Sequence, residues 1–513
     1  MKKMISYVLI GVGFAFAVHA ASVPSPKNSF LKTCGGPLVQ AHRGSCQEYD
    51  DNAIGGFKRC LEKGIKGFEI DFKYTKDHHI IVMHDETIDR TTDGHGAPEE
   101  MTFAELRQYR LKMSSEPIPD IDEVLEVLGG RDDIFVEFEM KVYPNGFYGN
   151  RGTLERFCRE VVEKVESKMC PGTYVFTAWS PYTLMTFRNI NPDTPLGFII
   201  CHAMTPLELD FAKLLNLTSV LPMMNTPPEL VKAAHDEGMS VCLWPVKDLE
   251  TYNEAKAKGS DRITTDYAVL LTRAIEGRPK KVIAMDLDAT LCQHRSPIPE
   301  KNMQALKELC GKYKCIMSGA GNAPRIYKQM GNFPIDIVGN YGMQIAEAAD
   351  GNFRIVKAVT NEVDKAFFRE KTDYLRQKYG YTEYEGEPLE FHTSGMVTFG
   401  LLGTSPSAEH KVAFDPDKKK RRAMYKEVCD IFKDFSVYIG GSTSFDFAGK
   451  EYNKYDATLR WAKEHGYTLD DVLFIGDDFA DGGGDSHVRI KGMDHIVIYD
   501  YRQFADNVRV LLK

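Results

Sequence analysis

The sequence predicts an α/β protein with two domains: an eight-stranded parallel (β/α)8 barrel and a second α/β unit with an inserted α+β cap. Three observations lead to this prediction. The chain has 513 residues, which is too many for a single hydrophobic core. Across residues 37–275, short apolar runs alternate with helical stretches, as in repeated strand–helix units. A polar linker at 276–281 then precedes a new apolar run, which opens the second unit at 282–513.

The expected strands of the barrel are short apolar runs, most of them separated by helical stretches. The third run follows the second so closely that we expect it to be an extra hairpin strand. The runs are 38–41, 67–72, 80–84, 134–141, 174–177, 196–200, 219–221, 240–244 and 262–265.

Composition narrows the class of partner. Apolar residues make up 43% of the chain and charged residues 27%, as is ordinary for a soluble globular protein. The net charge of −9 argues against nucleic acid, because a phosphate backbone recruits basic surfaces. Small phosphate compounds need only local positive charge, so they remain possible substrates.

Residues 1–20 are predicted to be a signal peptide. A pair of lysines precedes the apolar stretch 5–18, and Val18-His19-Ala20 suits a cleavage site. The protein is therefore expected to be exported, either periplasmic or secreted, with a flexible leader at 21–36. The alternative is an uncleaved membrane anchor. No later segment is long and apolar enough to cross a membrane.

The cysteines do not predict a zinc site. The chain has 11 of them and no Cys-x-x-Cys pair. Export would permit disulfides, but spacing alone leaves the pairing open, and most are interpreted as small buried apolar residues. They are Cys34, Cys46, Cys60, Cys158, Cys170, Cys201, Cys242, Cys292, Cys310, Cys315 and Cys429.

Polar residues gather where the first strands of the barrel end. Carboxylates two residues apart on a strand face the same side, and the carboxyl ends of parallel strands form one rim. Two histidines, three carboxylates, one arginine and one lysine are therefore expected to converge. They are His42, Arg43, Glu69, Asp71, His84, Glu139 and Lys141.

This set suits the hydrolysis of a phosphodiester. The three carboxylates are hard oxygen ligands, which suit Ca²⁺ or Mg²⁺. The arginine and the lysine can neutralise phosphate oxygens. The two histidines can serve as general base and general acid.

Residues 37–271 resemble the glycerophosphodiester phosphodiesterase family. The resemblance rests on ordered signals, namely His42-Arg43-Gly44, Glu69-x-Asp71, His84-Asp85, Asp89 to Gly94, Glu139-x-Lys141, Trp244 and Thr265-Asp266-Tyr267. It implies that His42 and His84 are the acid–base pair. It also implies a Ca²⁺ or Mg²⁺ ion held by Glu69, Asp71 and Glu139.

The same resemblance implies the substrate contacts. Arg43 and Lys141 would hold the phosphate, and Trp244 and Phe176 would line the glycerol pocket. The chain departs from the family at 50–53, where Asp-Asp-Asn-Ala replaces the usual Pro-Glu-Asn-Thr. This departure puts the local support of the site in question.

A second set of polar residues marks strand ends in the second domain. Asp286 and Asp288 follow the apolar run 282–285 two residues apart, which suits a carboxylate nucleophile with a neighbouring acid/base carboxyl. Ser318 follows another apolar run, and Asp477 ends a third. Lys454 precedes a helical segment. A nucleophilic carboxylate needs its repulsion with phosphate offset, which Mg²⁺ and a lysine can do.

The second domain resembles the haloacid dehalogenase-like superfamily, whose four signals occur here in order. The resemblance implies a Rossmann-like core with Asp286 as nucleophile and Asp288 as acid/base. Ser318, Gly319 and Lys454 would hold the phosphate. The implied Mg²⁺ ligands are Asp286, Asp288 and Asp477, assisted by Asp478, Asp481 or Asp485.

Residues of about 343–439 are predicted to be the cap, because they are richer in aromatic and charged residues. Their basic run 418–422 is interpreted as a solvated helix start. The cap resembles the eukaryotic-type phosphomannomutase branch at 390–396 and at 438–446. That branch grips a second phosphate with arginines, whereas this chain has His392-Thr393 and Thr404 in those places. We therefore expect hydrolysis of a monophosphate.

The leading hypothesis is a bifunctional phosphoesterase that acts on small phosphodiesters and phosphomonoesters. The barrel would release glycerol 3-phosphate and an alcohol, and the second domain would dephosphorylate the glycerol phosphate. Alternatives are an unrelated sugar phosphate, a phosphomannomutase-like isomerase, or a module that binds phosphorylated glycans or lipid head groups without turnover. Fusion of two domains does not fix their substrates.

Overall fold

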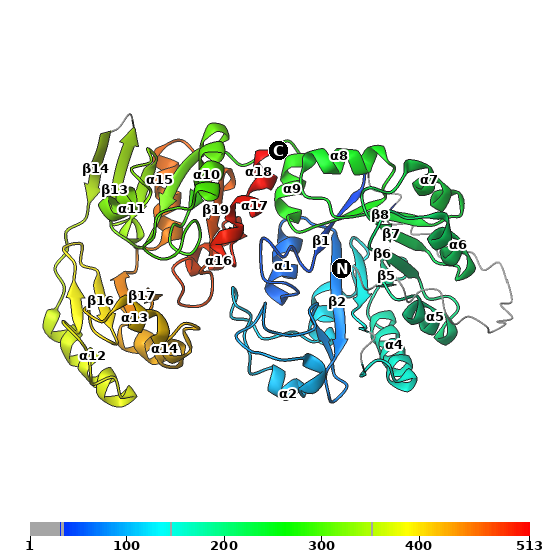
Figure 1. Ribbon diagram of the computed structural model, residues 1–513, viewed down its shortest axis with the longest axis horizontal. Coiled ribbons are helices and arrows are strands. Elements are labelled where there is room, and N and C mark those ends of the chain that lie inside the picture. Colours follow the sequence, from blue (N-terminus) through cyan, green and yellow to red (C-terminus); the bar gives the residue numbers. More distant parts are fainter. Residues whose placement is uncertain (1–30, 32–34, 144–145, 350–351) are drawn as a thin grey trace.

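The structure is a computed structural model that describes Leu31 and residues 35–143, 146–349 and 352–513. It contains a closed barrel, a second α/β domain beside it, and a cap subdomain on the second domain (Figure 1). The predicted signal peptide and most of the predicted leader lie outside the described residues.

Eight parallel strands close the barrel. Its sheet has nine strands in the order β1-β9-β8-β7-β6-β5-β4-β2-β3, and a β1–β2 pairing joins the ends. The short strand β3 (Ile80–Val82) is antiparallel to β2 and lies outside the closed ring, as the hairpin prediction requires. The barrel strands are β1 (Leu38–His42), β2 (Gly67–Tyr74), β4 (Phe135–Met140), β5 (Tyr174–Ala178), β6 (Leu196–Ile200), β7 (Ser219–Pro222), β8 (Ser240–Leu243) and β9 (Arg262–Thr265).

Helices surround the barrel (Figure 1). Local signals start them: Asp120 and Glu123 form a capping box at α3, and proline stands in the first turn of α5, α6 and α7. The helices are α1 (Ile54–Glu62), α2 (Phe103–Leu106), α3 (Ile121–Leu128), α4 (Arg151–Glu166), α5 (Pro181–Ile190), α6 (Pro206–Leu214), α7 (Pro228–Asp236), α8 (Leu249–Ala257) and α9 (Ala268–Ile275).

A polar network fills part of the barrel interior. The guanidinium of Arg262 on β9 is fully buried and donates to Glu137 Oε2 on β4 at 2.9 Å. It also donates to Gln40 Oε1 on β1 at 2.6 Å and to Ser219 Oγ on β7 at 2.7 Å. These bonds tie four strands across the barrel beneath its carboxyl-terminal ends. A buried ion pair keeps its charges only when its remaining polar atoms find partners, and this network supplies most of them.

The second domain is built on a seven-stranded sheet in the order β14-β13-β12-β11-β10-β19-β20. Five neighbouring strands are parallel, and the hairpin β13–β14 extends the sheet in antiparallel fashion. The strands are β10 (Val282–Met285), β11 (Lys314–Ser318), β12 (Asp336–Gly339), β13 (Gln344–Ala349), β14 (Asn352–Ala358), β19 (Val472–Gly476) and β20 (His495–Val497). Its helices are α10 (Glu300–Lys312), α11 (Ala323–Gln329), α15 (Lys454–Glu464), α16 (Ser486–Ile490), α17 (Phe504–Asn507) and α18 (Arg509–Leu512).

The cap is a four-stranded antiparallel sheet with helices. Its order is β15-β16-β18-β17, and it has its own apolar core. The boundaries differ from the expected 343–439, because the hairpin at 344–358 pairs with the core sheet and β18 pairs with the cap. The cap elements are α12 (Lys365–Tyr379), β15 (Leu389–Phe391), β16 (Val397–Gly400), α13 (Ala408–Phe414), α14 (Lys419–Ile431), β17 (Phe435–Gly440) and β18 (Ser444–Gly449).

The two domains share a packed interface. Met113 of the barrel lies in the same apolar cluster as Phe479 and Val497 of the second domain. The hydroxyl of Tyr267 donates to the carbonyl of Asn507 at 3.0 Å. Buried Asp494 pairs with Arg59 of α1, with Lys63 directly after α1 and with Lys280 of the linker, with N–O distances of 3.0, 2.8 and 2.6 Å. The barrel therefore completes the core of the second domain.

The described residues also bear on the cysteines and on membrane spans. The cysteines found there are free thiols, and six of them are buried. The helices found there are all too short or too polar to cross a membrane.

Substitution of Arg262 by methionine should strongly destabilise the barrel. The change leaves the Glu137 carboxylate buried without its cation, which costs about 3–5 kcal/mol. Thermal or urea unfolding of the Arg262→Met variant measures the loss. Lys232→Met is the matched control, because Lys232 pairs with Asp236 on the surface, where such pairs contribute about 0–1 kcal/mol. Equal stability of the two variants would contradict the role of the network.

His495 should make stability depend on pH. Burial, together with the charge of Arg59, lowers the pKa of His495 to about 3. The unfolded chain takes up this proton near pH 6.5 and the folded chain does not, so stability falls as pH drops through that range. Relative to His495→Phe, the wild type should lose about 1.4 kcal/mol per pH unit below pH 6.5. Thermal midpoints between pH 7 and pH 5 measure the difference, and exposed His95→Gln should match the wild type.

Candidate active sites

Three carboxylates meet at the carboxyl-terminal ends of the barrel strands, called here the catalytic rim. The register pairs Asp71 on β2 with Glu139 on β4, and His42 on β1 with Glu69 on β2. One ligand atom from each of Glu69, Asp71 and Glu139 lies within 4.8 Å of the others. Glu69 Oε1 is buried without a hydrogen-bond partner, and Asp71 Oδ1 is buried beside the ammonium of Lys141. Such a set of oxygen donors with unused lone pairs fits Ca²⁺ or Mg²⁺.

Two cations border this cluster. Lys141 Nζ lies 3.2 Å from Asp71 Oδ1 and 2.6 Å from Glu139 Oε1, and Arg43 Nε lies 3.5 Å from Asp71 Oδ2. Burial raises the pKa of Asp71, but Lys141, His84 and Arg43 outweigh it and hold the pKa below its usual range. Burial and the other two carboxylates raise the pKa of Glu69 instead. The two cations therefore leave the cluster short of positive charge.

Each rim histidine contacts a carboxylate through Nδ1. His42 Nδ1 lies 2.6 Å from Asp266 Oδ1, and His84 Nδ1 lies 2.7 Å from Asp85 Oδ1. Despite burial, these and neighbouring contacts hold the pKa of both aspartates below the usual range, so both accept hydrogen bonds. Nδ1 of each histidine must then carry the proton, which leaves Nε2 as a proton acceptor. Burial also lowers the pKa of His84.

Residues 50–53 depart from the family pattern, but Asp51 and Asn52 still form hydrogen bonds with the rim residues Arg43 and Asp71. Asp51 Oδ2 accepts from Arg43 Nη1 at 3.0 Å and from Arg90 Nη2 at 2.6 Å. Asn52 Nδ2 donates to Asp71 Oδ2 at 2.8 Å. The shorter carboxylate at position 51 therefore still reaches Arg43.

The two predicted aromatic contacts have different outcomes. Trp244 follows β8 at the catalytic rim and is half-buried, with its indole N–H donating to Leu221 O at 2.7 Å. Phe176 faces outward from the barrel toward α5, which contradicts its predicted role in the glycerol pocket. Alternation along β5 turns Thr177 inward, where its hydroxyl donates to Glu137 Oε1 at 3.2 Å. Phe176 instead stacks on Phe187 of α5, with ring centroids 5.5 Å apart.

The second site lies at the carboxyl ends of β10, β11 and β19, which are neighbours in the sheet. Lys454 Nζ lies 2.9 Å from Asp286 Oδ1 and 2.7 Å from Asp485 Oδ1. Asp286, Asp477 and Asp485 each offer an oxygen within 4.8 Å of the others. Burial raises the pKa of Asp286 to about 7, with Lys454 opposing the shift and Asp485 adding to it. A divalent cation among these oxygens would favour the ionised nucleophile.

The serine and the glycine that follow β11 take different positions. Ser318 lies at the end of β11, and its Oγ accepts from Thr458 Oγ1 at 3.2 Å. The amide of Gly319 donates to Val338 O at 3.0 Å, so it is not free to bind a phosphate oxygen. A Cβ at position 319 would lie 2.8 Å from Ile326 Cδ1. Close packing, rather than the predicted phosphate contact, accounts for this glycine.

Asp288 is held apart from the predicted metal ligands. Its carboxylate accepts from Gln329 Nε2 at 2.8 Å, from the amide of Arg295 at 2.7 Å and from Arg325 Nη2 at 3.1 Å. Although burial raises its pKa, Arg325 and His294 lead the contacts that bring it below the usual range. The side chain can accept a proton here, but its oxygens are engaged elsewhere than at a metal.

The two other predicted metal ligands are also paired elsewhere. Asp478 Oδ1 lies 2.7 Å from Lys418 Nζ of the cap, and Asp481 Oδ1 lies 2.7 Å from Arg489 Nη2. Asp485, the third of the predicted assisting ligands, is the one that lies with Asp286 and Asp477. The interpretation of 418–422 as a solvated helix start is wrong in part, because Lys418 reaches the core and Arg421 is buried against Asp415.

Some functional candidates escaped the sequence prediction of sites. Asp266 and Asp85 were visible only as parts of family signals, and Lys418 as part of a basic run. Asp266 contacts His42 and Lys418 contacts Asp478, and each pair is far apart in the sequence, so spacing does not relate the two residues. Asp85, by contrast, directly follows its partner His84.

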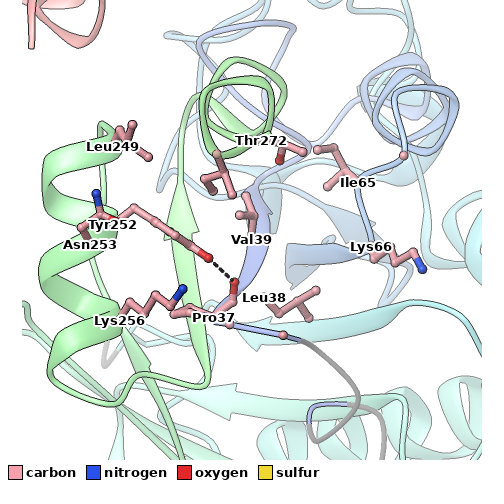
Figure 2. Close-up of a pocket in the computed structure, with 14 residues that line it drawn as sticks. Pro37, Leu38, Val39, Ile65, Lys66, Leu249, Tyr252, Asn253, Lys256 and Thr272 are labelled. Atoms are coloured by element: carbon pink, nitrogen blue, oxygen red, sulfur yellow. Dashed lines mark hydrogen bonds between the residues drawn. The ribbon is translucent and has the colours of Figure 1, made fainter. Parts of the chain in front are cut away.

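A cavity of about 440 Å³ lies at the opposite end of the barrel (Figure 2). Pro37, Leu38 and Val39 line it at the start of β1, with Tyr252 and Lys256 of α8 on the other side. It contains none of the predicted site residues. In barrels of this kind the amino-terminal face serves stability, so this cavity is not a candidate active site.

Substitution at Asp485 should impair the second site far more than substitution at Asp481. Loss of the Asp485 carboxylate removes a cation ligand and a partner of Lys454, and we expect Asp485→Asn to lower Mg²⁺ affinity or activity about 10- to 100-fold. Asp481→Asn is the matched control and should stay near wild type. Mg²⁺ titration of p-nitrophenyl phosphate hydrolysis measures both. A larger loss in Asp481→Asn would reverse the assignment.

Comparison with known proteins finds relatives of both domains. The glycerophosphoryl diester phosphodiesterase family matches residues 42–270, and a haloacid dehalogenase-like hydrolase family matches residues 405–482. A glycerophosphodiester phosphodiesterase of Caldanaerobacter subterraneus subsp. tengcongensis is 31% identical over 238 residues, which are 45% of this chain and 93% of that protein. A phosphomannomutase of Encephalitozoon cuniculi is 25% identical over 220 residues, which are 41% of this chain and 84% of that protein.

Among solved structures, a glycerophosphodiester phosphodiesterase from Parabacteroides distasonis is 22% identical with a TM-score of 0.41. The similarity covers 47% of this chain and 98% of that one. The ordered motifs, the rim geometry and the relative at 31% identity together establish the assignment. The chain belongs to the glycerophosphodiester phosphodiesterase family and also carries a haloacid dehalogenase-like phosphatase domain.

Proposed function

We propose that the barrel hydrolyses glycerophosphodiesters with a bound Ca²⁺ or Mg²⁺ ion and releases glycerol 3-phosphate and an alcohol. We further propose that the second domain, with Mg²⁺, then hydrolyses the glycerol phosphate. The observation that carries the first step is the buried cluster of Glu69, Asp71 and Glu139 between two histidines and two cations.

The rim residues have two roles in the proposed cleavage of the diester, namely charge neutralisation and proton transfer. A cation held by the three carboxylates would neutralise phosphate oxygens. Arg43 and Lys141 add positive charge beside the same cluster. His42 and His84 each present Nε2, so one can take a proton from the attacking water while the other, once protonated, gives a proton to the leaving oxygen.

The residues of the second site suit a carboxylate nucleophile. Asp286 forms the bond to phosphorus while the bond between phosphorus and the alcohol oxygen breaks, and that oxygen leaves with a proton from Asp288. Lys454 at 2.9 Å offsets the repulsion between carboxylate and phosphate. Asp288 can accept a proton from the water that releases the phosphate. Mg²⁺ among Asp286, Asp477 and Asp485 would supply the remaining positive charge.

A sugar phosphate is a second candidate substrate for this domain. The similarity to a phosphomannomutase over 220 residues favours it. A mutase must hold a phosphate at each end of its sugar, and His392 and Thr404 stand where arginines are expected for that purpose. We therefore propose hydrolysis rather than isomerisation.

We also propose that the protein acts outside the cytoplasm. The support is the lysine pair, the apolar stretch and the cleavage-site pattern at the start of the sequence.

The two-step scheme predicts how single substitutions divide the products. With glycerophosphocholine, Ca²⁺ and Mg²⁺, wild type should release choline and inorganic phosphate. Asp286→Asn should release choline alone, because its nucleophile is lost. His42→Ala should release neither, yet still liberate phosphate from added glycerol 3-phosphate. Both products are followed in one time course.

If choline appears without phosphate, and added glycerol 3-phosphate is also inert, the coupled scheme is wrong. The second domain would then be tested with mannose phosphates. If choline never appears with any glycerophosphodiester, the proposal for the barrel is wrong.

A further inference from the structure

The loop between β1 and α1 (residues 43–53) carries the contacts that set the catalytic rim. Arg43 begins the loop, and its amide donates to Glu69 Oε2 at 3.0 Å. The loop ends with Asp50, Asp51 and Asn52, where the family pattern has Pro-Glu-Asn. This position therefore gains a carboxylate in place of a proline.

The three consecutive side chains at 50–52 point to three different partners. Asn52 donates to the metal-cluster residue Asp71 at 2.8 Å. Asp51 accepts from Arg43 at 3.0 Å. Asp50 faces away from the rim and is fully buried. A displacement of the Asp50 side chain must therefore move the neighbours that hold Arg43 and Asp71.

The partners of Asp50 come from both domains. Its carboxylate accepts from the amides of Met113 and Ser114, with a shortest distance of 2.6 Å to Ser114. It also accepts from the hydroxyl of Tyr499 at 3.2 Å, and Tyr499 belongs to the phosphatase domain. A buried carboxylate is stable only where donors surround it, so Tyr499 is part of what allows an aspartate here.

A second bond joins the same two segments. The amide of Val497 on β20 donates to the carbonyl of Gln47 at 2.9 Å, in the middle of the loop. Close by, Ser115 Oγ accepts from the amide of Asp481 at 3.0 Å, next to the Asp50-binding amides. The loop is thus held from outside by the edge of the phosphatase sheet.

We propose that the phosphatase domain is a positioning element of the phosphodiesterase site, acting through the Tyr499 to Asp50 hydrogen bond. Tyr499 touches no substrate and no member of the metal cluster. It fixes Asp50, so Asp51 and Asn52 keep Arg43 and Asp71 in place for the diester. The inference rests on the proposed phosphodiesterase function of the barrel.

The proposal predicts an unusual separation of effects. Tyr499 lies in the phosphatase domain, but its substitution by phenylalanine should lower the phosphodiesterase activity of the barrel. We expect kcat/KM for glycerophosphocholine to fall roughly 5- to 10-fold. The decrease should appear as a higher KM, because Arg43 would hold the phosphate of the diester less well. The kcat for the diester and the hydrolysis of p-nitrophenyl phosphate should stay nearly unchanged.

The matched control is Tyr501→Phe, the same change two residues further along the chain, which should behave as wild type. A variant that merely lost folded protein would show a lower kcat at constant KM. That result for Tyr499→Phe would overturn the positioning role.

A double-mutant cycle tests whether Tyr499 acts through Asp50. Asp50→Asn should raise KM for the diester, and adding Tyr499→Phe should increase the loss by no more than about twofold. Independent roles would instead multiply the two losses. A multiplied loss, or a Tyr499→Phe enzyme with wild-type KM, contradicts the proposal while leaving the phosphodiesterase function intact. Wild-type protein that cleaves no glycerophosphodiester would instead overturn the function on which it rests.

Discussion

The concentration of buried negative charge at the catalytic rim is the constraint on which the barrel site depends. Strand register places Asp71 beside Glu139 and puts Glu69 next to His42, so the cluster follows directly from the pairing of β1, β2 and β4. Charges of one sign cannot remain in a water-poor place without compensation. Arg43 and Lys141 supply part of it, and the buried Glu69 Oε1, which has no hydrogen-bond partner, leaves a position for a divalent cation to supply the rest.

The surrounding polar contacts can be understood as consequences of this constraint. Arg43 can lie against the cluster only because Asp51 and Glu69 fix its two ends. Asp51 in turn lies between Asn52, which donates to Asp71 of the metal cluster, and Asp50, which accepts from Tyr499 of the phosphatase domain. The chain of contacts therefore runs from the cation site through Asp50 to the other domain. It gives the fusion of the two domains a structural reason that is independent of their sharing a metabolite.

The sequence predicted the barrel strands and the rim because each strand is an apolar run, and several of these runs end in polar residues. Every expected barrel strand is present, and the seven predicted rim residues lie together at its carboxyl-terminal ends. Phe176 was misplaced although strand alternation was available to correct it. The choice of Asp485 over Asp481 depends on a Gly-rich turn whose path the sequence does not specify. The Asp50–Tyr499 contact joins positions 449 residues apart, beyond the reach of any local pattern.

The two sites solve the same electrostatic problem in different ways. In the barrel, two cations face three carboxylates, none of which has to form a bond to phosphorus. In the phosphatase domain, the proposed nucleophile Asp286 would have to attack as a carboxylate, yet burial raises its pKa to about 7 even with Lys454 beside it. Asp485 adds to this shift, since it shares the lysine and repels the Asp286 carboxylate. A divalent cation among these oxygens would remove that repulsion and free Lys454 to meet the incoming phosphate. The acidity of the nucleophile and the binding of the substrate are therefore coupled through a single lysine.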